Sequence, residues 1–300
     1  MHAKLATCAA ALAVLAVVAG CGPASRAVTT DRLLAMVRDA PVAAGHTRCA
    51  VFDADGTLWD FDLSSTLVRQ TLRDRTAGEG GLAAMNALLA AFGLPPGADV
   101  YAATRAVDEA LDSGALHAAG RSRGWDEDEV NARVWPHYNW LYLGMPAEAV
   151  VDRARRLLSD PSFRARVFPG MRAVVAALRS RGYRVRVISG GVHEFVAAGA
   201  AEAGFLSDEV RGLKVAYRDG RLTGEVVAPV PYQQGKATIA RELCGGRPMF
   251  AFGDSVASGD AAMLDLAALP VAVRPAGRHR EAARRRGMLV YERPEAPGAR

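Results

Sequence analysis

The sequence predicts an α/β fold in which a parallel sheet is combined with an inserted helical unit. Beyond Pro169, short apolar runs alternate with segments of helical periodicity, which is typical of a parallel sheet flanked by helices. Between 63 and 165, apolar residues recur at spacings of three and four, which predicts consecutive helices and no strand. One more apolar run, 48–52, precedes this helical region. We therefore expect a first strand before the insertion and the rest of the sheet after it.

The predicted elements follow from periodicity and from Gly and Pro punctuation. We expect helices at 30–38, 82–94, 101–111, 127–143, 147–158, 171–181, 192–203 and 234–243. We expect strands at 48–52, 183–188, 249–252 and 270–273, and a hairpin of 213–217 with 222–227 around Asp219-Gly220.

The first residues resemble a bacterial secretion signal. Lys4 is followed by an apolar run that ends in Val18-Ala19-Gly20-Cys21. Small residues directly before a cysteine are similar to a lipobox, so we expect residues 1–20 to be removed and Cys21 to carry lipid. Acyl chains on Cys21 would anchor an exported lipoprotein to the outer face of a bacterial cell membrane or to the outer membrane. An ordinary signal peptide or a membrane anchor is the alternative.

The charge pattern does not favour a nucleic-acid partner. The net charge is +5, but the basic residues are scattered, and a solvated helix face explains the one dense cluster. That cluster comprises Arg278, Arg280, Arg284, Arg285 and Arg286. Arginine supplies nearly all the positive charge, since the only lysines are Lys4, Lys214 and Lys236.

The end of the first strand carries two carboxylates. Asp53-Ala54-Asp55-Gly56-Thr57 follows the apolar run directly, so both acids can face one pocket. One carboxylate there can attack phosphorus while the other transfers a proton to and from the reacting oxygens. A turn rich in helix-capping aspartates is the alternative.

Three further segments carry groups suited to binding phosphate. Ser189-Gly190-Gly191 lies between a strand and a helix, where backbone N–H groups can hold an anion. Lys236 opens a helix and offers a compact ammonium. Asp254 follows another strand and can supply an oxygen ligand to a hard divalent cation.

In this order, the acidic pair, Ser-Gly-Gly, Lys and Gly-Asp resemble the motifs of the haloacid dehalogenase (HAD) superfamily. The resemblance covers about residues 48–60 and 168–292. It implies a three-layer Rossmann-like core formed by 21–60 and 168–300, and a helical cap formed by 61–167.

The resemblance also implies roles for the motif residues. Asp53 would be the nucleophile that forms an aspartyl-phosphate, and Asp55 the general acid and base. Ser189, Gly190 and Lys236 would bind the phosphate. Mg²⁺ would be held by Asp53, the carbonyl oxygen of Asp55, and Asp254. Asp55 also favours phosphatases, because dehalogenases of this superfamily lack an aspartate at that position.

The last acidic position departs from the family pattern. Asp260 lies six residues after Asp254, and Ser258 stands where an acid is usual. Three roles stay open for Asp260: binding the metal through water, orienting Lys236, or capping the next helix.

The substrate is expected to be a small phosphomonoester. The hairpin and the Gly-Lys that follows it look most like the phosphoserine phosphatase branch, and exported relatives act on phosphocholine-like esters. The segment from Trp135 to Tyr142 is rich in aromatic residues, which, with Asp60 or Asp62, can hold a cationic group. The interpretation we favour is that Trp135, Tyr138 and Tyr142 form one buried face of a cap helix. For His193, a capping or surface role is favoured over substrate contact.

Two cysteines remain after Cys21. The first and fourth strands are adjacent in this superfamily, which would place Cys49 and Cys244 at the same edge of the sheet, so we predict a disulfide between them. The oligomeric state is not predicted. The alternatives to a phosphatase are a non-catalytic lipoprotein that binds a phosphoester, and a phosphotransferase or phosphomutase.

Overall fold

The computed structural model describes residues 26–292, which form a parallel seven-stranded sheet and a two-stranded hairpin. The strand order in the large sheet is β1-β9-β8-β7-β2-β3-β4, and every neighbouring pair is parallel. Its strands are β1 (Arg26–Ala27), β2 (His46–Phe52), β3 (Arg184–Val192), β4 (Val210–Leu213), β7 (Arg247–Gly253), β8 (Leu269–Val273) and β9 (Leu289–Tyr291). The predicted parallel α/β fold is confirmed.

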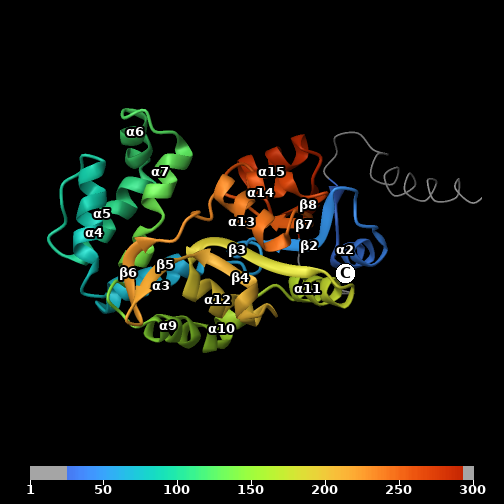
Figure 1. Cartoon of the computed structure of the whole chain (residues 1–300), viewed down its shortest axis with the longest axis horizontal. Coiled ribbons are helices and arrows are strands. Elements are labelled where there is room, and N and C mark those ends of the chain that lie inside the picture. The colour runs from blue at the N-terminus through green and yellow to red at the C-terminus, as the bar shows by residue number, and fades with distance from the viewer. Residues whose placement is uncertain (1–25, 293–300) are drawn as a thin grey trace, which may run out of the picture.

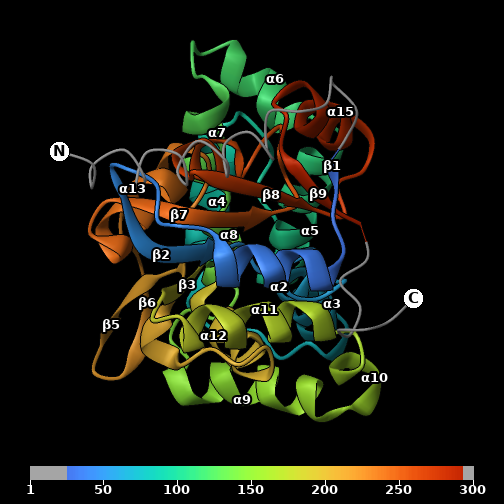
Figure 2. The same cartoon turned by 90° about the vertical axis from the view of Figure 1, so that its right-hand side faces the viewer.

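Helices cover both faces of this sheet (Figures 1 and 2). One face carries α2 (Thr30–Asp39), α11 (Pro169–Ser180) and α12 (His193–Glu202), and the other carries α13 (Gln234–Cys244), α14 (Ala261–Leu266) and α15 (Gly277–Arg285). Side chains alternate along β2: Ala50 and Phe52 join one apolar cluster, whereas Cys49 and Val51 join the other. The three layers therefore follow from strands that are apolar on both sides.

The helical insertion lies between β2 and β3. It comprises α3 (Leu63–Asp74), α4 (Gly81–Ala91), α5 (Val100–Asp112), α6 (Ala115–Arg121), α7 (Glu127–Val134), α8 (His137–Trp140), α9 (Ala147–Ser159) and α10 (Pro161–Arg164). The helices α4 to α7 stand apart from the sheet, at the left of Figure 1, whereas α9 packs against α12 of the core. The insertion therefore has two parts: α9 is packed on the core, and α4 to α7 form a separate helical group.

One predicted helix is wrong. The segment 127–143 forms two short helices, because α7 ends at Val134 and α8 begins at His137. Pro136 lies between them, and a proline inside a helix removes a hydrogen-bond donor and clashes with the preceding turn. The segment is therefore not one continuous helix.

The predicted hairpin is confirmed with shifted bounds. It consists of β5 (Val215–Arg218) and β6 (Arg221–Val226), joined at Asp219-Gly220, where both residues have positive φ. Leu213, expected in the first hairpin strand, ends β4 of the large sheet after the short 3-10 helix Ser207–Glu209.

The predicted signal segment 1–20 and Cys21 lie outside the described residues. Within 26–292, no helix combines the length and apolar character that crossing a membrane requires.

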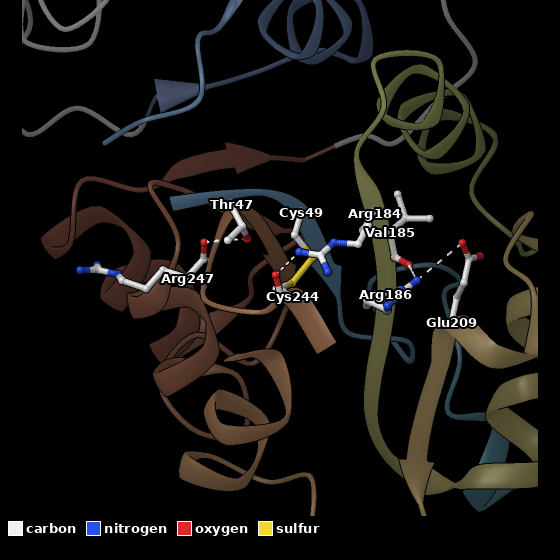
Figure 3. Close-up of a disulfide and its surroundings, with 8 residues drawn as sticks. All are labelled: Thr47, Cys49, Arg184, Val185, Arg186, Glu209, Cys244 and Arg247. Atoms are coloured by element: carbon white, nitrogen blue, oxygen red, sulfur yellow. Dashed lines mark hydrogen bonds and ion pairs between the residues drawn. A yellow bond between two sulfur atoms is a disulfide. The ribbon is translucent and has the colours of Figure 1, made fainter. Parts of the chain in front are cut away.

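A disulfide joins β2 to α13 (Figure 3). Cys49 lies in β2 and Cys244 is the last residue of α13, with their Cα atoms 5.6 Å apart. Both side chains are fully buried, and the Arg184 guanidinium donates a hydrogen bond to the carbonyl of Cys244. The bond closes a sequence separation of 195 residues, so it restricts the unfolded chain over most of its length.

Replacing both cysteines with alanine is expected to lower the free energy of unfolding by about 2–5 kcal/mol, because the unfolded chain regains the freedom that a long covalent loop removes. Urea unfolding of the double variant and of the oxidised wild type measures this difference. Mass spectrometry of the unfolded wild type, with and without reductant, should show a gain of two hydrogens. An unchanged mass together with equal urea midpoints would contradict the covalent link.

Candidate active site

A pocket of about 660 Å³ opens at the carboxyl ends of β2, β3 and β7. All eight residues predicted for the catalytic site lie in its wall: Asp53, Asp55, Ser189, Gly190, Lys236, Asp254, Ser258 and Asp260. The first of these eight residues, Asp53, and the last, Asp260, are 207 positions apart in the chain. The parallel sheet brings them together because its carboxyl ends share one edge.

Lys236 lies at the centre of the charged groups. Its Nζ donates to Oδ1 of Asp53 at 2.5 Å and to Oδ1 of Asp260 at 2.6 Å. All three residues are buried, with 6% or less of each exposed. Lys236 stands in the first turn of α13, which packs against β2 and β3. The ammonium is therefore fixed beside Asp53 by the packing of its helix.

This crowding shifts the pKa values of the group. Burial and the neighbouring Asp260 raise the pKa of Asp53 well above its ordinary value, although Lys236 opposes them. Burial lowers the pKa of Lys236, but Asp260 and Asp53 outweigh it and leave that pKa above its ordinary value. The ammonium thus stays charged at neutral pH and offsets part of the acidic charge.

Asp55 is held by two donors on one oxygen. Its Oδ1 accepts from the indole Nε1 of Trp59 at 2.6 Å and from the backbone N–H of Leu63 at 2.9 Å. Burial, followed by the negative charge of Asp62, raises the pKa of Asp55 to about 7. A carboxyl group with that pKa can both give and take a proton near neutral pH.

Asp254 lies against the turn that carries the acidic pair. A Cβ on Gly56, whose φ is +76°, would lie 2.5 Å from Oδ2 of Asp254, so only glycine fits there. Burial and Asp260 raise the pKa of Asp254 to about 6. Carboxylate oxygens of Asp53, Asp254 and Asp260 lie within 4.8 Å of one another. These oxygens are the donor type that Mg²⁺ prefers.

Ser189 and the two glycines after it occupy the last residues of β3, which continues to Val192 instead of ending at Ile188 as predicted. The hydroxyl of Ser189 accepts from the N–H of Gly191 at 3.1 Å. The hydroxyl of Ser64 accepts from Val192 N–H at 3.0 Å and would be 2.6 Å from a Cβ on Gly191. Small residues thus let this backbone pass close beside the pocket.

Asp260 performs one of the three roles left open by the sequence. One of its oxygens accepts from Lys236, and the other accepts from the N–H of Ser255 at 2.9 Å. Its side chain makes no capping hydrogen bond to α14, although it occupies the N-cap position. Asp260 therefore orients Lys236 and fixes the loop that carries Asp254. Ser258 lies in the pocket wall and contributes its N–H to a turn with Ser255.

The aromatic segment does not form a single buried face, so that interpretation was wrong. Tyr142 is fully buried, packs edge-on against Phe195 and bonds to the hydroxyl of Thr71 at 3.0 Å. Trp135 and Tyr138 instead line the pocket. One continuous helix would have aligned these residues, but α7 ends at Val134 and α8 at Trp140, so Trp135 and Tyr142 lie outside both helices.

The other acids considered for substrate binding lie in the pocket wall with partners of their own. Asp60 accepts from the Arg166 guanidinium at 2.5 Å, and Asp62 caps α3 by accepting from Ser65 N–H at 2.7 Å. His193 accepts from Gly212 N–H at 3.2 Å and is not among the pocket residues found in the described part of the chain. Arg278, from the basic cluster, also reaches the pocket wall.

Sequence reasoning missed several pocket residues on the helical side. They are Leu111, His117, Glu127 and Asn131; on the core side, Tyr232 from the loop before α13 was missed as well. One signal was available: Glu127, Asn131 and Trp135 are spaced by four and form a polar row beside the apolar Val130 and Val134. That spacing predicts a polar helix face, but it does not predict that this face lines the pocket.

Solved structures share this fold. A protein of unknown function from Bordetella pertussis aligns with 82% of this chain and 98% of its own, at 19% identity and a TM-score of 0.58. A HAD family hydrolase from Salmonella enterica aligns with 83% of this chain and 68% of its own, at 17% identity and a TM-score of 0.53.

Curated relatives match over shorter lengths. A phosphoserine phosphatase of Streptomyces coelicolor is 33% identical over 163 residues, which are 52% of this chain and 35% of that protein. One from Halobacterium salinarum is 34% identical over 139 residues, 43% of this chain and 65% of that protein. The matched segment thus covers between about a third and just under two thirds of the length of these relatives. The haloacid dehalogenase-like hydrolase family model matches residues 50–269, which include the whole acidic and lysine cluster, and the chain belongs to that family.

Proposed function

We propose that the chain is a Mg²⁺-dependent phosphomonoesterase that hydrolyses a small phosphorylated metabolite, phosphoserine- or phosphocholine-like, through an aspartyl-phosphate on Asp53. The arrangement of Asp53, Asp55 and Lys236 around one pocket carries this proposal. Similarity to phosphoserine phosphatases supports it. The pocket volume suits a small ester rather than a polymer.

In the first step, an oxygen of Asp53 attacks phosphorus and the bond from phosphorus to the ester oxygen breaks. Asp55 gives its proton to the departing alkoxide, so the alcohol leaves neutral. A pKa of about 7 keeps much of Asp55 protonated at neutral pH, as this step needs. Lys236 and Ser189 stand where they can hold the phosphoryl oxygens.

In the second step, water attacks the phosphorus of the aspartyl-phosphate. Asp55, now a carboxylate, takes a proton from that water, and the bond between phosphorus and the Asp53 oxygen breaks. Phosphate and the original Asp53 carboxylate result. Asp55 ends protonated, ready for the next substrate.

The donor set fits a hard divalent cation. Asp53 and Asp254 offer carboxylate oxygens close together, and the glycine at position 56 leaves room for them to approach. A bound Mg²⁺ would neutralise phosphate charge and orient the phosphoryl group for in-line attack. Both oxygens of Asp260 are engaged, one by Lys236 and one by the N–H of Ser255, whereas Lys236 holds only Oδ1 of Asp53. Asp53, Asp254 and the carbonyl of Asp55 are therefore the proposed ligands.

We expect purified residues 22–300 to release phosphate from p-nitrophenyl phosphate when Mg²⁺ is present and to stop when it is chelated. Asp53→Asn should lower kcat by at least ~10³-fold, because no carboxylate oxygen remains to attack phosphorus. Asp208→Asn, an exposed acid remote from the pocket, is the matched control. Turnover by a clean Asp53→Asn preparation would refute the covalent mechanism, and a folded wild type with no turnover would favour a phosphoester-binding protein.

Asp55→Asn is expected to separate the two steps. p-Nitrophenolate leaves without a proton, so mixing enzyme and ester should still give a burst of one p-nitrophenol per protein. Steady-state turnover should fall by ~10²–10⁴-fold, because the base for the second step is lost. Stopped-flow absorbance measures both phases, and adding a second alcohol tests for transfer to an acceptor other than water. A burst-free variant with unchanged steady-state rate would contradict this assignment of Asp55.

We also propose the lipoprotein form, on the Val18-Ala19-Gly20-Cys21 sequence alone. Expressed in a bacterium with radioactive palmitate, the full chain should incorporate label and sediment with membranes, whereas Cys21→Ala should do neither. Equal labelling of both forms would contradict lipidation at Cys21.

A further inference from the structure

The pocket half formed by the helical insertion contains two side-chain donors without partners. Among residues 26–292, no hydrogen bond satisfies Nδ2 of Asn131 or the indole Nε1 of Trp135, and both nitrogens are buried. Asn131 is only 3% exposed, and both residues lie in the pocket wall. Buried N–H groups are nearly always paired in folded proteins, so two unpaired ones on neighbouring residues of one pocket wall indicate a partner that binds there.

The helix α7 presents these donors on one face. Glu127, Asn131 and Trp135 follow one another at a spacing of four, so they lie in a row along the helix, and all three line the pocket. Val130 and Val134 are buried in the apolar cluster of the insertion. The rotational position of α7 is thus fixed by its apolar contacts, and the polar row is held toward the pocket.

Trp135 also lies close to the phosphate-binding segment. A Cβ placed on Gly190 would be 3.7 Å from its Nε1, and the ring packs edge-on against Tyr232. Asn131 is one turn farther from that segment, and its Oδ1 lies 3.3 Å from Nε2 of His117. Since Oδ1 can only accept, His117 donates there and the amide is oriented with Nδ2 as its free donor.

We propose that Asn131 and Trp135 donate to an oxygen on the alcohol part of the substrate, and so select phosphomonoesters whose alcohol carries a carboxylate or hydroxyl oxygen besides the ester oxygen. This rests on the proposed function. The assignment follows from donor chemistry: an N–H group pairs with an oxygen acceptor and gains nothing from an ammonium or a methyl group. An alcohol without such an oxygen leaves both donors buried and unpaired.

Three esters with different alcohols test the selection. O-phosphoserine carries a carboxylate, glycerol 3-phosphate carries hydroxyls, and O-phosphoethanolamine carries neither but keeps the ammonium of phosphoserine. We expect kcat/KM for at least one of the first two to exceed that for phosphoethanolamine by about tenfold or more, the scale of a hydrogen bond lost in a buried site. The better of the two identifies the acceptor.

Variants then assign the selection to the two donors. Asn131→Leu keeps the side-chain volume and Trp135→Phe keeps an aromatic ring, but each removes the N–H donor. In each variant, kcat/KM for the preferred ester should fall to within about threefold of kcat/KM for phosphoethanolamine. Phenyl phosphate, which has no such oxygen, should lose less kcat/KM than the preferred ester in either variant, so that the ratio between the two esters falls. Asn139→Leu is the matched control, because Asn139 is a buried amide of the next helix that does not line the pocket.

Equal losses on all four esters would show a merely structural role, and unchanged ratios would show that the donors do not select; either result overturns the inference. Thermal unfolding establishes that each variant is folded. Turnover of none of the four esters by the folded wild type with Mg²⁺ would instead contradict the proposed function, and the selection with it.

Discussion

The buried contact of Lys236 with Asp53 and Asp260 is the interaction on which the site depends. Two carboxylates in a shared, buried space repel each other, and only a cation fixed between them lets them lie so close. The three residues come from the end of β2, the start of α13 and the loop after β7, so this contact also holds those segments together. Removing one member of a buried charged group leaves the other charges uncompensated, which typically lowers the free energy of unfolding by about 3–5 kcal/mol. Stability and catalytic geometry therefore share the same residues.

Much of this arrangement could be predicted from the sequence. Strands ending in Asp53 and Asp254, and the Ser189 segment between a strand and a helix, are local patterns, and a parallel sheet sends such ends to one edge. The role of Asp260 could not be predicted, because its spacing from Asp254 fits no simple rule. Its partner, Lys236, lies 24 residues away and meets it only through the packing of α13. The pairing of charges is a three-dimensional property that no local pattern contains.

The helical side of the pocket was harder to predict, for a physical reason. Apolar periodicity through 127–143 continued past Pro136, and the prediction gave more weight to the periodicity than to the proline. Tyr142 lies in the core, whereas Trp135 and Tyr138 lie beside the pocket. Aromatic residues are equally suited to both places, so composition alone cannot assign them. The geometry of the insertion, and with it the shape of the substrate-facing wall, had to come from the structure.

The position of the disulfide constrains the order of events as the chain matures. Cys49 precedes the helical insertion, whereas Cys244 follows the insertion, β3 and β4 and precedes β7, β8 and β9. A polypeptide made or exported from its N-terminus presents the first sulfur long before the second. The cross-link can therefore close only after Cys244 has emerged, when β7, β8 and β9 still follow it in the chain. Until then Cys49 is a free thiol, and β2 is not yet linked covalently to α13.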